Sequence, residues 1–432
     1  MALIYIKDSV LRSGTLQSLL TLIILQINLA NGNDLVLVQA VFRHGDRSPT
    51  RSYPNDRHSD YWTQGLGQLT KRGMYQEYRL GKFFRQKYMD QNTFMSVNYN
   101  RSEIYIRSTD KDRTLMSAYC ILAGMYPPIN GSEEQWNPGL NWQPIPVHTE
   151  PLTEDHLLNA DAPCPRYDEL FAKFLASDFI AKFTARYQDL INKAAKLSGL
   201  PPTLIGLMTL VDPLFCEYTH GLNMSEWKTV LPFHPLLIQL LDYQNSYRFH
   251  TDEMAKLRGG PLLAELIGKM KTALNPVAEP SPKMYLYSAH DTTLVTLLRV
   301  MNVFNSRTPV YSSCVMVELW KPKGQGNPYV NVLYKNETNS NNLTVLHIPG
   351  CGKVCTLEHF INILKNNVSK DIHAECNSVL QQTSDVHVGV VVLSCLVALL
   401  VMVVTALIIL LYRKRRTSMS YRPLATNDDE YT

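Results

Sequence analysis

A short charged run, Arg43-His44-Gly45-Asp46-Arg47-Ser48-Pro49, combines two guanidinium groups and one imidazole around a glycine. Arginine presents a planar fork of donors that matches the oxygens of a phosphate or carboxylate. Glycine lets the backbone come close to a bound group, and an imidazole can serve as a base or a nucleophile. The run therefore predicts an anion-binding loop with chemistry of its own, in preference to a basic surface turn.

Two later segments carry charged residues of the same kind. Arg107 ends an alternating stretch over 102–108, and His290-Asp291 follows the apolar stretch 284–288. The first motif follows another apolar stretch, 35–42, so all three lie at the end of, or just after, runs that are typical of strands. Ligands of open α/β sheets bind beyond the carboxyl ends of the strands. Taken alone, Arg107 would be interpreted as a surface residue.

Together, the Arg43–Pro49 motif, Arg107 in an Ile-Arg-Ser-Thr context and the His290-Asp291 pair resemble the histidine acid phosphatases of the phosphoglycerate mutase-like superfamily. The resemblance covers roughly residues 34 to 376, and it is strongest to the lysosomal and then the prostatic members. It implies a phosphohistidine enzyme that hydrolyses phosphate monoesters at acidic pH without a cofactor. His44 would be the nucleophile and Asp291 the proton donor. The residues that would hold the phosphoryl group are Arg43, Arg47, Arg107 and His290.

The pKa of His44 should be low, because clustered arginines disfavour a charged imidazole.

Three other interpretations of the site stay open. A metal site made of His44, His290 and Asp291 lacks a His-x-x-x-His or carboxylate cluster to support it. A mutase belongs to the same superfamily, and a catalytically silent receptor-like ectodomain could share the fold; the presence of both His44 and Asp291 argues against the silent protein.

The pattern of apolar residues predicts an α/β protein with a mixed sheet flanked by helices. Further strands are expected over 315–320 and 329–334, joined as an antiparallel hairpin, and Thr70 is expected to cap a helix. Strand signals fade between about 151 and 251, where helical patterns dominate. This block predicts a smaller, mainly helical cap beside the sheet.

Both ends of the chain carry apolar segments. Residues 1–30 resemble a secretory signal peptide, which places a lumenal domain over 31–385. The uncharged run 388–411 is long enough to cross a bilayer, which needs about 20 residues. Basic residues at 413–416 follow it, so the tail, 412–432, should be cytosolic. We therefore expect a single-pass type I protein.

The tail contains Tyr421-Arg422-Pro423-Leu424, a Tyr-x-x-apolar string followed by acidic residues. Such strings resemble signals that adaptor complexes bind as an extended strand, with pockets for Tyr421 and Leu424. A lysosomal location follows from this interpretation. A cell-surface phosphatase is the alternative.

Sequons and cysteines agree with passage through the secretory pathway. The sequons all precede the apolar run and lie at Asn100, Asn130, Asn223, Asn336, Asn342 and Asn367. Six paired cysteines would allow 15 connectivities, so the spacing cannot select one. The resemblance implies the disulfides Cys164–Cys376, Cys216–Cys314 and Cys351–Cys355, with Cys120 free.

The overall charge is mild, +4 over 432 residues, which argues against dedicated nucleic-acid binding. The expected partners are small phosphomonoesters, the membrane and the adaptor complexes. A homodimer is expected only from the resemblance.

Overall fold

The computed structural model describes residues 32–419 apart from 229 and 231–232, and it contains a seven-stranded mixed sheet. The strand order is β2-β3-β1-β4-β5-β6, with β7 paired to β5. The strands are β1 (Asn33–Arg43), β2 (Ile104–Ser108), β3 (Met284–Ala289), β4 (Cys314–Pro322), β5 (Tyr329–Lys335), β6 (Thr344–Leu346) and β7 (Cys355–Thr356). The mixed α/β fold predicted from the sequence is confirmed, including the antiparallel β4–β5 hairpin.

Strands β1, β2 and β3 run parallel, and their carboxyl ends lie at one edge of the sheet. The register pairs Arg43 with Ala289 and Ser108 with Ser288. This arrangement brings the segments that follow three distant strands to the same place. Continuous apolar sequence in β1 and β3 suits strands that are covered on both faces.

Helices cover both faces of the sheet. The pair α2 (Lys71–Arg85) and α3 (Asp112–Met125) packs on one face around a core that includes Phe42, Phe84 and Ile106. On the other face, the Gln39 side chain donates to a backbone carbonyl of α9 (Asp252–Leu274). Helix α10 (Asp291–Val300) follows β3 directly and packs against α9. Thr70 caps α2 through the Gly73 N–H, as predicted.

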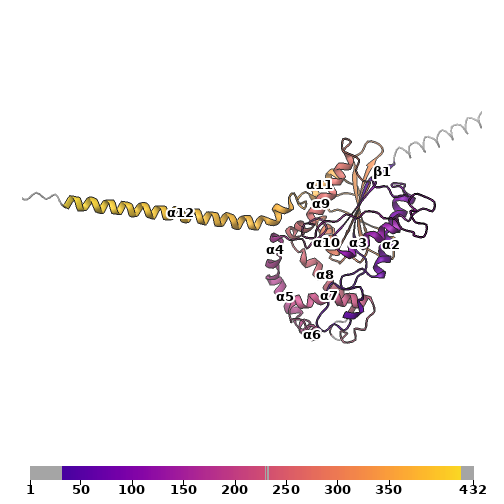
Figure 1. Cartoon of the computed structure of the whole chain (residues 1–432), viewed down its shortest axis with the longest axis horizontal. Helices are drawn as coiled ribbons and strands as arrows, with labels where there is room; N and C mark the ends of the chain where they lie inside the picture. Colours follow the sequence, from indigo (N-terminus) through magenta and orange to yellow (C-terminus); the bar gives the residue numbers. More distant parts are fainter. Residues whose placement is uncertain (1–31, 229, 231–232, 420–432) are drawn as a thin grey trace, which may run out of the picture. The chain divides into compact units, whose positions relative to one another are not determined.

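A largely separate group of helices fills the region where strand signals fade. These helices are α4 (Pro165–Leu175), α5 (Asp178–Arg186), α6 (Gln188–Ser198), α7 (Leu204–Thr219) and α8 (Phe233–Arg248). In Figure 1 they form the helical part beside the sheet. Trp227, Leu210 and Leu240 belong to their own apolar core, which the sheet strands do not enter. The expected helical cap, here called the cap, is therefore present.

The chain divides into two compact units, Met1–Glu375 and Cys376–Thr432. Helix α11 (Leu357–Leu364) belongs to the first unit, and α12 extends over Ile372–Met419. Its stretch Val391–Arg416 is long and apolar enough to cross a membrane. The remaining described elements are a 3-10 turn, Ser59–Tyr61, and a π-helical turn, Gln86–Gln91. The predicted signal peptide, Tyr421 and Leu424 lie outside the described residues.

Candidate active site

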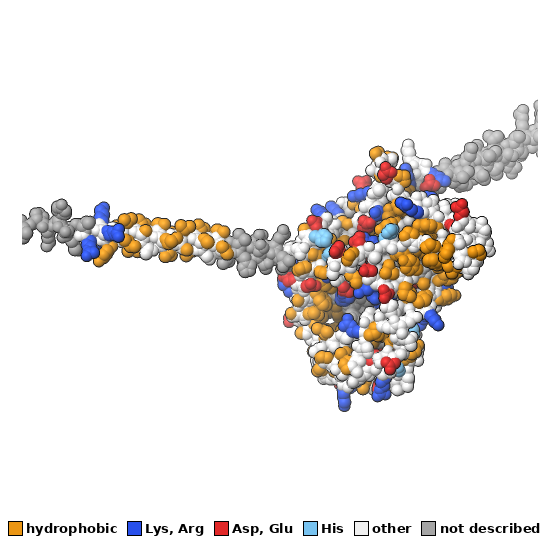
Figure 2. Space-filling view, in the orientation of Figure 1, with side chains coloured by type: hydrophobic (Ala, Val, Ile, Leu, Met, Phe, Trp, Pro, Cys, Tyr) orange, Lys and Arg blue, Asp and Glu red, His pale blue; other side chains and the backbone are white. Residues whose placement is uncertain are grey.

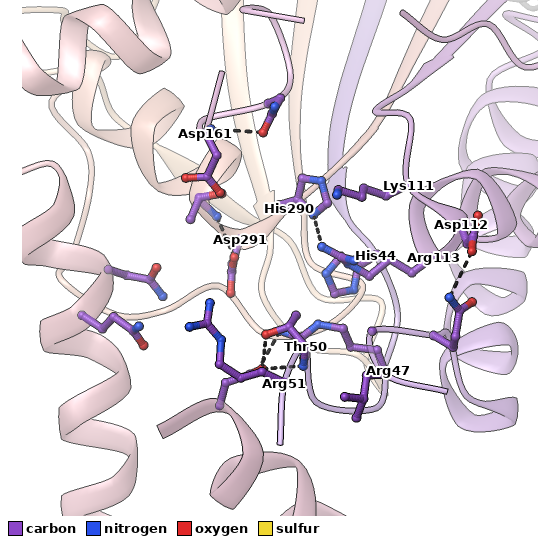
Figure 3. A pocket seen from close by; sticks show the side chains of 18 of the residues that line it. His44, Arg47, Thr50, Arg51, Lys111, Asp112, Arg113, Asp161, His290 and Asp291 are labelled. Carbon is purple, nitrogen blue, oxygen red and sulfur yellow. Dashed lines mark hydrogen bonds and ion pairs between the residues drawn. The ribbon is translucent and has the colours of Figure 1, made fainter. Parts of the chain in front are cut away.

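A polar cavity of about 640 Å³ opens at the carboxyl ends of the parallel strands. Figure 3 shows His44, Arg47, Arg113, His290 and Asp291 gathered around it. His44 and His290 lie one residue after β1 and β3, and their ring centroids are 5.5 Å apart. The sheet register alone therefore accounts for the meeting of two motifs that are far apart in the sequence.

His44 is held in one tautomer by its own loop. Its Nδ1 lies 2.8 Å from the Gly45 carbonyl oxygen, a group that can only accept a hydrogen bond. Nδ1 must therefore carry the proton, which leaves a lone pair on Nε2. Burial lowers the pKa of His44 well below its ordinary value, and Arg113, Arg43 and Arg47 lower it further. The imidazole is thus neutral and nucleophilic.

The glycine of the motif is required by close packing against α2. A Cβ at Gly45 would lie 2.4 Å from the Gly73 carbonyl oxygen, and one at Gly73 would lie 2.1 Å from the Asp46 carbonyl oxygen. These contacts exclude any side chain at either position. The two glycines therefore place the motif directly on the first turn of α2.

Arg43 supports Asp291 from outside the cavity lining. Its guanidinium is 3.0 Å from the Asp291 carboxylate and lies 4.1 Å over the Tyr311 ring. Burial alone would raise the pKa of Asp291, but Arg43, Arg47 and His290 outweigh it and lower the pKa. In the unliganded site, Asp291 is therefore an ionised carboxylate.

Arg47 is oriented by Asp212, a residue of cap helix α7. The two side chains form an ion pair of 2.8 Å, and Asp212 also accepts hydrogen bonds from the backbone and hydroxyl of Thr50. The ion pair raises the pKa of Arg47 despite its burial, so this arginine stays charged. Sequence reasoning missed Asp212, because nothing in its local helical pattern distinguishes it from a surface carboxylate.

Arg107 was predicted to hold the phosphoryl group, and the structure places it beside two carboxylates. Its guanidinium pairs with Asp155 at 2.7 Å and with Glu150 at 3.0 Å, and it does not line the cavity. Arg113, on the first turn of α3, does line the cavity, together with Arg47, Arg51 and Arg248. Burial, with Arg47 and Arg43 nearby, lowers the pKa of Arg113 to about 10. Several positive charges so close together are typical of a site that binds an anion.

His290 lies between Arg113 and a pair of threonines. Its Nδ1 is 3.4 Å from an Arg113 nitrogen, which can only donate, so Nδ1 accepts. Its Nε2 then donates to the Thr109 hydroxyl at 2.9 Å, and that hydroxyl lies 2.8 Å from Thr114. Burial and Arg113 lower the pKa of His290, so this ring is neutral as well.

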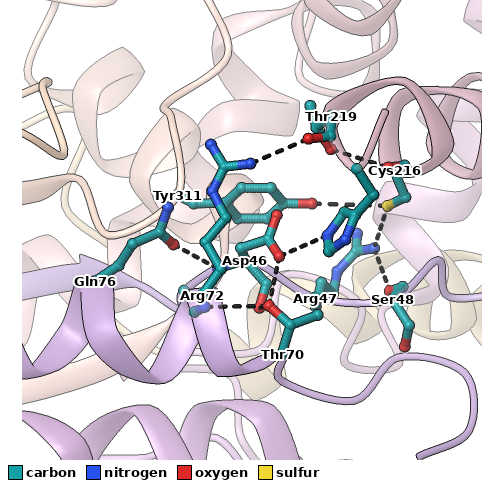
Figure 4. Close-up of polar contacts among 12 residues, drawn as sticks. Asp46, Arg47, Ser48, Thr70, Arg72, Gln76, Cys216, Thr219 and Tyr311 are labelled. Atoms are coloured by element: carbon teal, nitrogen blue, oxygen red, sulfur yellow. Dashed lines mark hydrogen bonds and ion pairs between the residues drawn. The ribbon is translucent and has the colours of Figure 1, made fainter. Parts of the chain in front are cut away.

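Asp46 anchors the motif without entering the cavity (Figure 4). Its carboxylate accepts hydrogen bonds from the Thr70 hydroxyl and from His220 Nε2, the latter at 2.8 Å. Its backbone N–H donates to Gln76 on α2. His220 therefore helps to fix the carboxylate of the motif.

The predicted pairing of Cys216 with Cys314 is wrong, since both are free and buried. Cys314 belongs to the apolar core under α2 and α3, whereas the Cys216 sulfur lies 3.7 Å from Arg47 beside the cavity. The other expected half-cystines are disulfide-bonded, with Cys351 and Cys355 joined to each other and Cys164 and Cys376 each bonded. Cys120 is free and half-buried, as expected.

Within the described part of the chain, no three His, Cys, Asp or Glu side chains gather as metal ligands. Among these described residues, no ligand cluster supports the interpretation of His44, His290 and Asp291 as a metal site.

The fold and site define a phosphoryl-binding α/β protein with a histidine at its centre, and comparison with known proteins gives the family. A family model described as the histidine phosphatase superfamily, branch 2, matches residues 34–335. The chain is 37% identical to human lysosomal acid phosphatase over 97% of this chain and 99% of the relative. It is 40% identical to human prostatic acid phosphatase over 82% and 90%. The chain therefore belongs to branch 2 of the histidine phosphatase superfamily.

Solved structures share the fold. A phytase from Hafnia alvei in complex with tartrate matches 80% of this chain and 98% of its own, with a TM-score of 0.59 and 18% identity. This likeness agrees with the predicted phosphoglycerate mutase-like architecture.

Proposed function

We propose that this protein is an acid phosphatase that hydrolyses phosphate monoesters through a phosphohistidine on His44. The observation that carries the proposal is the tautomer of His44. Because Nδ1 is committed to the Gly45 carbonyl, the reactive lone pair of Nε2 belongs to a neutral ring in a cavity lined by Arg47 and Arg113. Membership of the family and the acid phosphatase activity of the relatives support this assignment.

In the first step, His44 Nε2 attacks phosphorus while the bond from phosphorus to the ester oxygen breaks. Arg47 and Arg113 hold the non-bridging oxygens, and the leaving oxygen takes its proton from the carboxyl group of Asp291. His290, one residue before Asp291, acts through its contact with Arg113.

Asp291 must gain a proton before it can give one. Its ion pair with Arg43 keeps it ionised in the empty site, but a bound phosphate adds negative charge and attracts the same arginines. Both effects raise the pKa of Asp291 toward an acidic working pH. Protonation of Asp291 also releases Arg43 to contact the phosphoryl group. Binding of the substrate is therefore coupled to protonation of the proton donor.

In the second step, the Asp291 carboxylate takes a proton from water, the water oxygen attacks phosphorus, and the bond to Nε2 breaks. Inorganic phosphate leaves, and His44 returns to its neutral form. Acidic pH suits this cycle, because the lowered pKa of His44 keeps the ring unprotonated where an ordinary histidine would be charged.

The test uses the full chain in lipid nanodiscs with phenyl phosphate at about pH 5. The wild type should release phosphate, and acid-quenched enzyme should carry an acid-labile phosphoryl group on His44. Activity that depends on an added metal ion, or a phosphoryl group on another residue, would contradict the mechanism.

We also propose that the enzyme is a single-pass type I protein of the lysosomal membrane. The apolar stretch of α12, Val391–Arg416, and the relatives named lysosomal acid phosphatase support this placement. Signal-peptide removal near residue 30, a cytosolic tail that binds adaptor complexes, and glycosylation belong to the same proposal. Of the sequon asparagines, Asn100, Asn130, Asn223 and Asn342 are exposed and should be modified first.

A further inference from the structure

A second cavity, of about 550 Å³, lies among the cap helices and continues the polar cavity. The two cavities share part of their lining, so they form one continuous depression. The shared residues are Thr50, Arg51, Asp161, Asp212, Gln244 and Arg248. Figure 2 shows Lys and Arg side chains in the hollow between the sheet-bearing part and the cap, with hydrophobic side chains on the cap helices beside it.

The part of this cavity beyond the shared residues, here called the cap groove, is apolar. Four helices contribute to it, with Phe171 on α4, Ile180 on α5, Met208 on α7 and Tyr247 on α8. Among the described residues of this lining, only Thr209 and Tyr247 carry side-chain oxygen or nitrogen atoms, and the Thr209 hydroxyl already donates to the Ile205 carbonyl. The cap groove therefore offers an occupant apolar contact and little hydrogen bonding.

The apolar surface of the cap groove also reaches solvent. The Ile205 side chain is 67% exposed and Leu175 is 36% exposed, while Phe174 and Ile180 of the same lining are buried. Exposed apolar side chains that border a cavity mark a binding surface more often than isolated ones do.

We propose that the cap groove binds the leaving group of the substrate, and that this leaving group is a single long alkyl or acyl chain. This inference rests on the proposed function and specifies its substrate class. The ester oxygen must lie at Asp291, which lines the polar cavity together with the shared residues, so the substituent on that oxygen can pass over the shared residues. The substituent then extends into the cap groove.

The chemistry of the lining favours an alkyl chain over a peptide. A peptide brings backbone N–H and C=O groups, which cost free energy when they are buried without partners. An alkyl chain brings none. A sugar or inositol leaving group would likewise need hydrogen-bonding side chains, and these lie mainly in the shared region and not in the cap groove.

The test compares ethyl, butyl, octyl and decyl phosphate, each below its aggregation concentration, with the full chain in nanodiscs. These esters have similar leaving-group chemistry, so differences among them report on binding of the chain. A fully buried methylene is worth about fourfold in affinity, and a groove open on one side should yield about twofold per methylene in kcat/KM. The value for octyl phosphate should therefore exceed that for ethyl phosphate by well over tenfold.

The variants are Ile205→Asn with Met208→Asn, which make the cap groove polar, and Val277→Asn as a matched control. Val277 is 90% exposed and does not line the cap groove. The double variant should lose at least about tenfold in kcat/KM for octyl phosphate and keep the wild-type value for ethyl phosphate. The control should behave as the wild type with every ester. If the double variant fails to fold, Ile205→Asn alone serves, because that side chain is mostly exposed.

Two results would overturn the inference while leaving the phosphatase intact. One is a wild-type kcat/KM that does not rise with chain length, and the other is a double variant that retains the rise. Absence of turnover with every ester, including ethyl phosphate, would instead reject the proposed function itself.

Discussion

The two arginines Arg107 and Arg113 should respond to mutation in opposite ways, because one supports the fold and the other faces the cavity. Arg107 pairs with Asp155, whose side chain is fully buried. Removing the arginine leaves that carboxylate buried and without its charged partner. Loss of one member of a buried pair costs about 3 to 5 kcal/mol. Arg107→Met should therefore lower the free energy of unfolding by about that amount. Loss of the second ion pair should add little, because Glu150 is exposed to solvent.

Arg113→Met should do the reverse. Burial and its cationic neighbours lower the pKa of Arg113 from 12.5 to about 10, so its charge opposes folding in the empty enzyme. One pKa unit corresponds to about 1.4 kcal/mol. With allowance for solvent screening, the variant should be more stable than the wild type by about 1 to 3 kcal/mol. Its kcat/KM should fall by about 100-fold or more, because a donor to the transferring phosphoryl group is lost.

Urea unfolding with and without inorganic phosphate, together with kcat/KM for phenyl phosphate, measures both effects on the full chain. Phosphate should stabilise the wild type and the Arg107 variant, and stabilise the Arg113 variant much less. The reasoning would be refuted if the Arg107 variant were stable but inactive, or if the Arg113 variant kept wild-type kcat/KM.

The other predictions concern chemistry, pH and location. His44→Ala should abolish turnover without loss of fold, as judged by circular dichroism, and no phosphoenzyme should form. Asp291→Asn should slow alkyl phosphates far more than nitrophenyl phosphate, whose leaving group needs no proton; equal losses would exclude Asp291 as the acid. Folding lowers the pKa of His44 and of His290, so below about pH 6.5 the unfolded chain binds more protons than the folded chain. The free energy of unfolding should therefore fall as the pH drops from 7 to 5, by up to about 2 kcal/mol per histidine. Pairs of unfolding curves at the two pH values measure this fall, and bound phosphate should reduce it. Tyr421→Ala should leave kcat/KM unchanged and raise the surface-biotinylated fraction; an unchanged fraction would favour the cell-surface alternative.

Local sequence was enough to predict the strands that carry the site. The apolar runs before His44 and His290 are long and rich in residues that suit buried strands, and the structure places both in the centre of the sheet. The segments after parallel strands meet at one edge, so a pattern within each segment was sufficient. The cap was predicted in the same way, from the loss of strand signals and the gain of helical spacing.

What sequence could not settle was which side chains reach one another across the fold. Arg107 lies near the end of β2, and Arg113 lies six positions later, on the first turn of α3. Only Asp155 and Glu150, supplied by a distant loop, show that the first arginine is already paired. The cysteines present the same difficulty. Spacing cannot reveal that Cys216 sits beside Arg47 while Cys314 faces the apolar core.

The site also shows a division between chemistry and substrate choice. The sheet and its adjoining helix ends supply the imidazoles, the acid and most of the cations, and their positions are tied to buried backbone pairing. The cap supplies Asp212, which holds Arg47, and the apolar walls of the cap groove. Asp212 and Met208 are one helical turn apart on α7, so a single helix orients a phosphate-binding arginine and lines the proposed leaving-group site. A short ester would not reach Met208, so it would not help to fix the helix that holds Asp212 against Arg47. On this argument, chain length should affect kcat as well as KM, because binding of the leaving group and positioning of the arginine depend on the same helix.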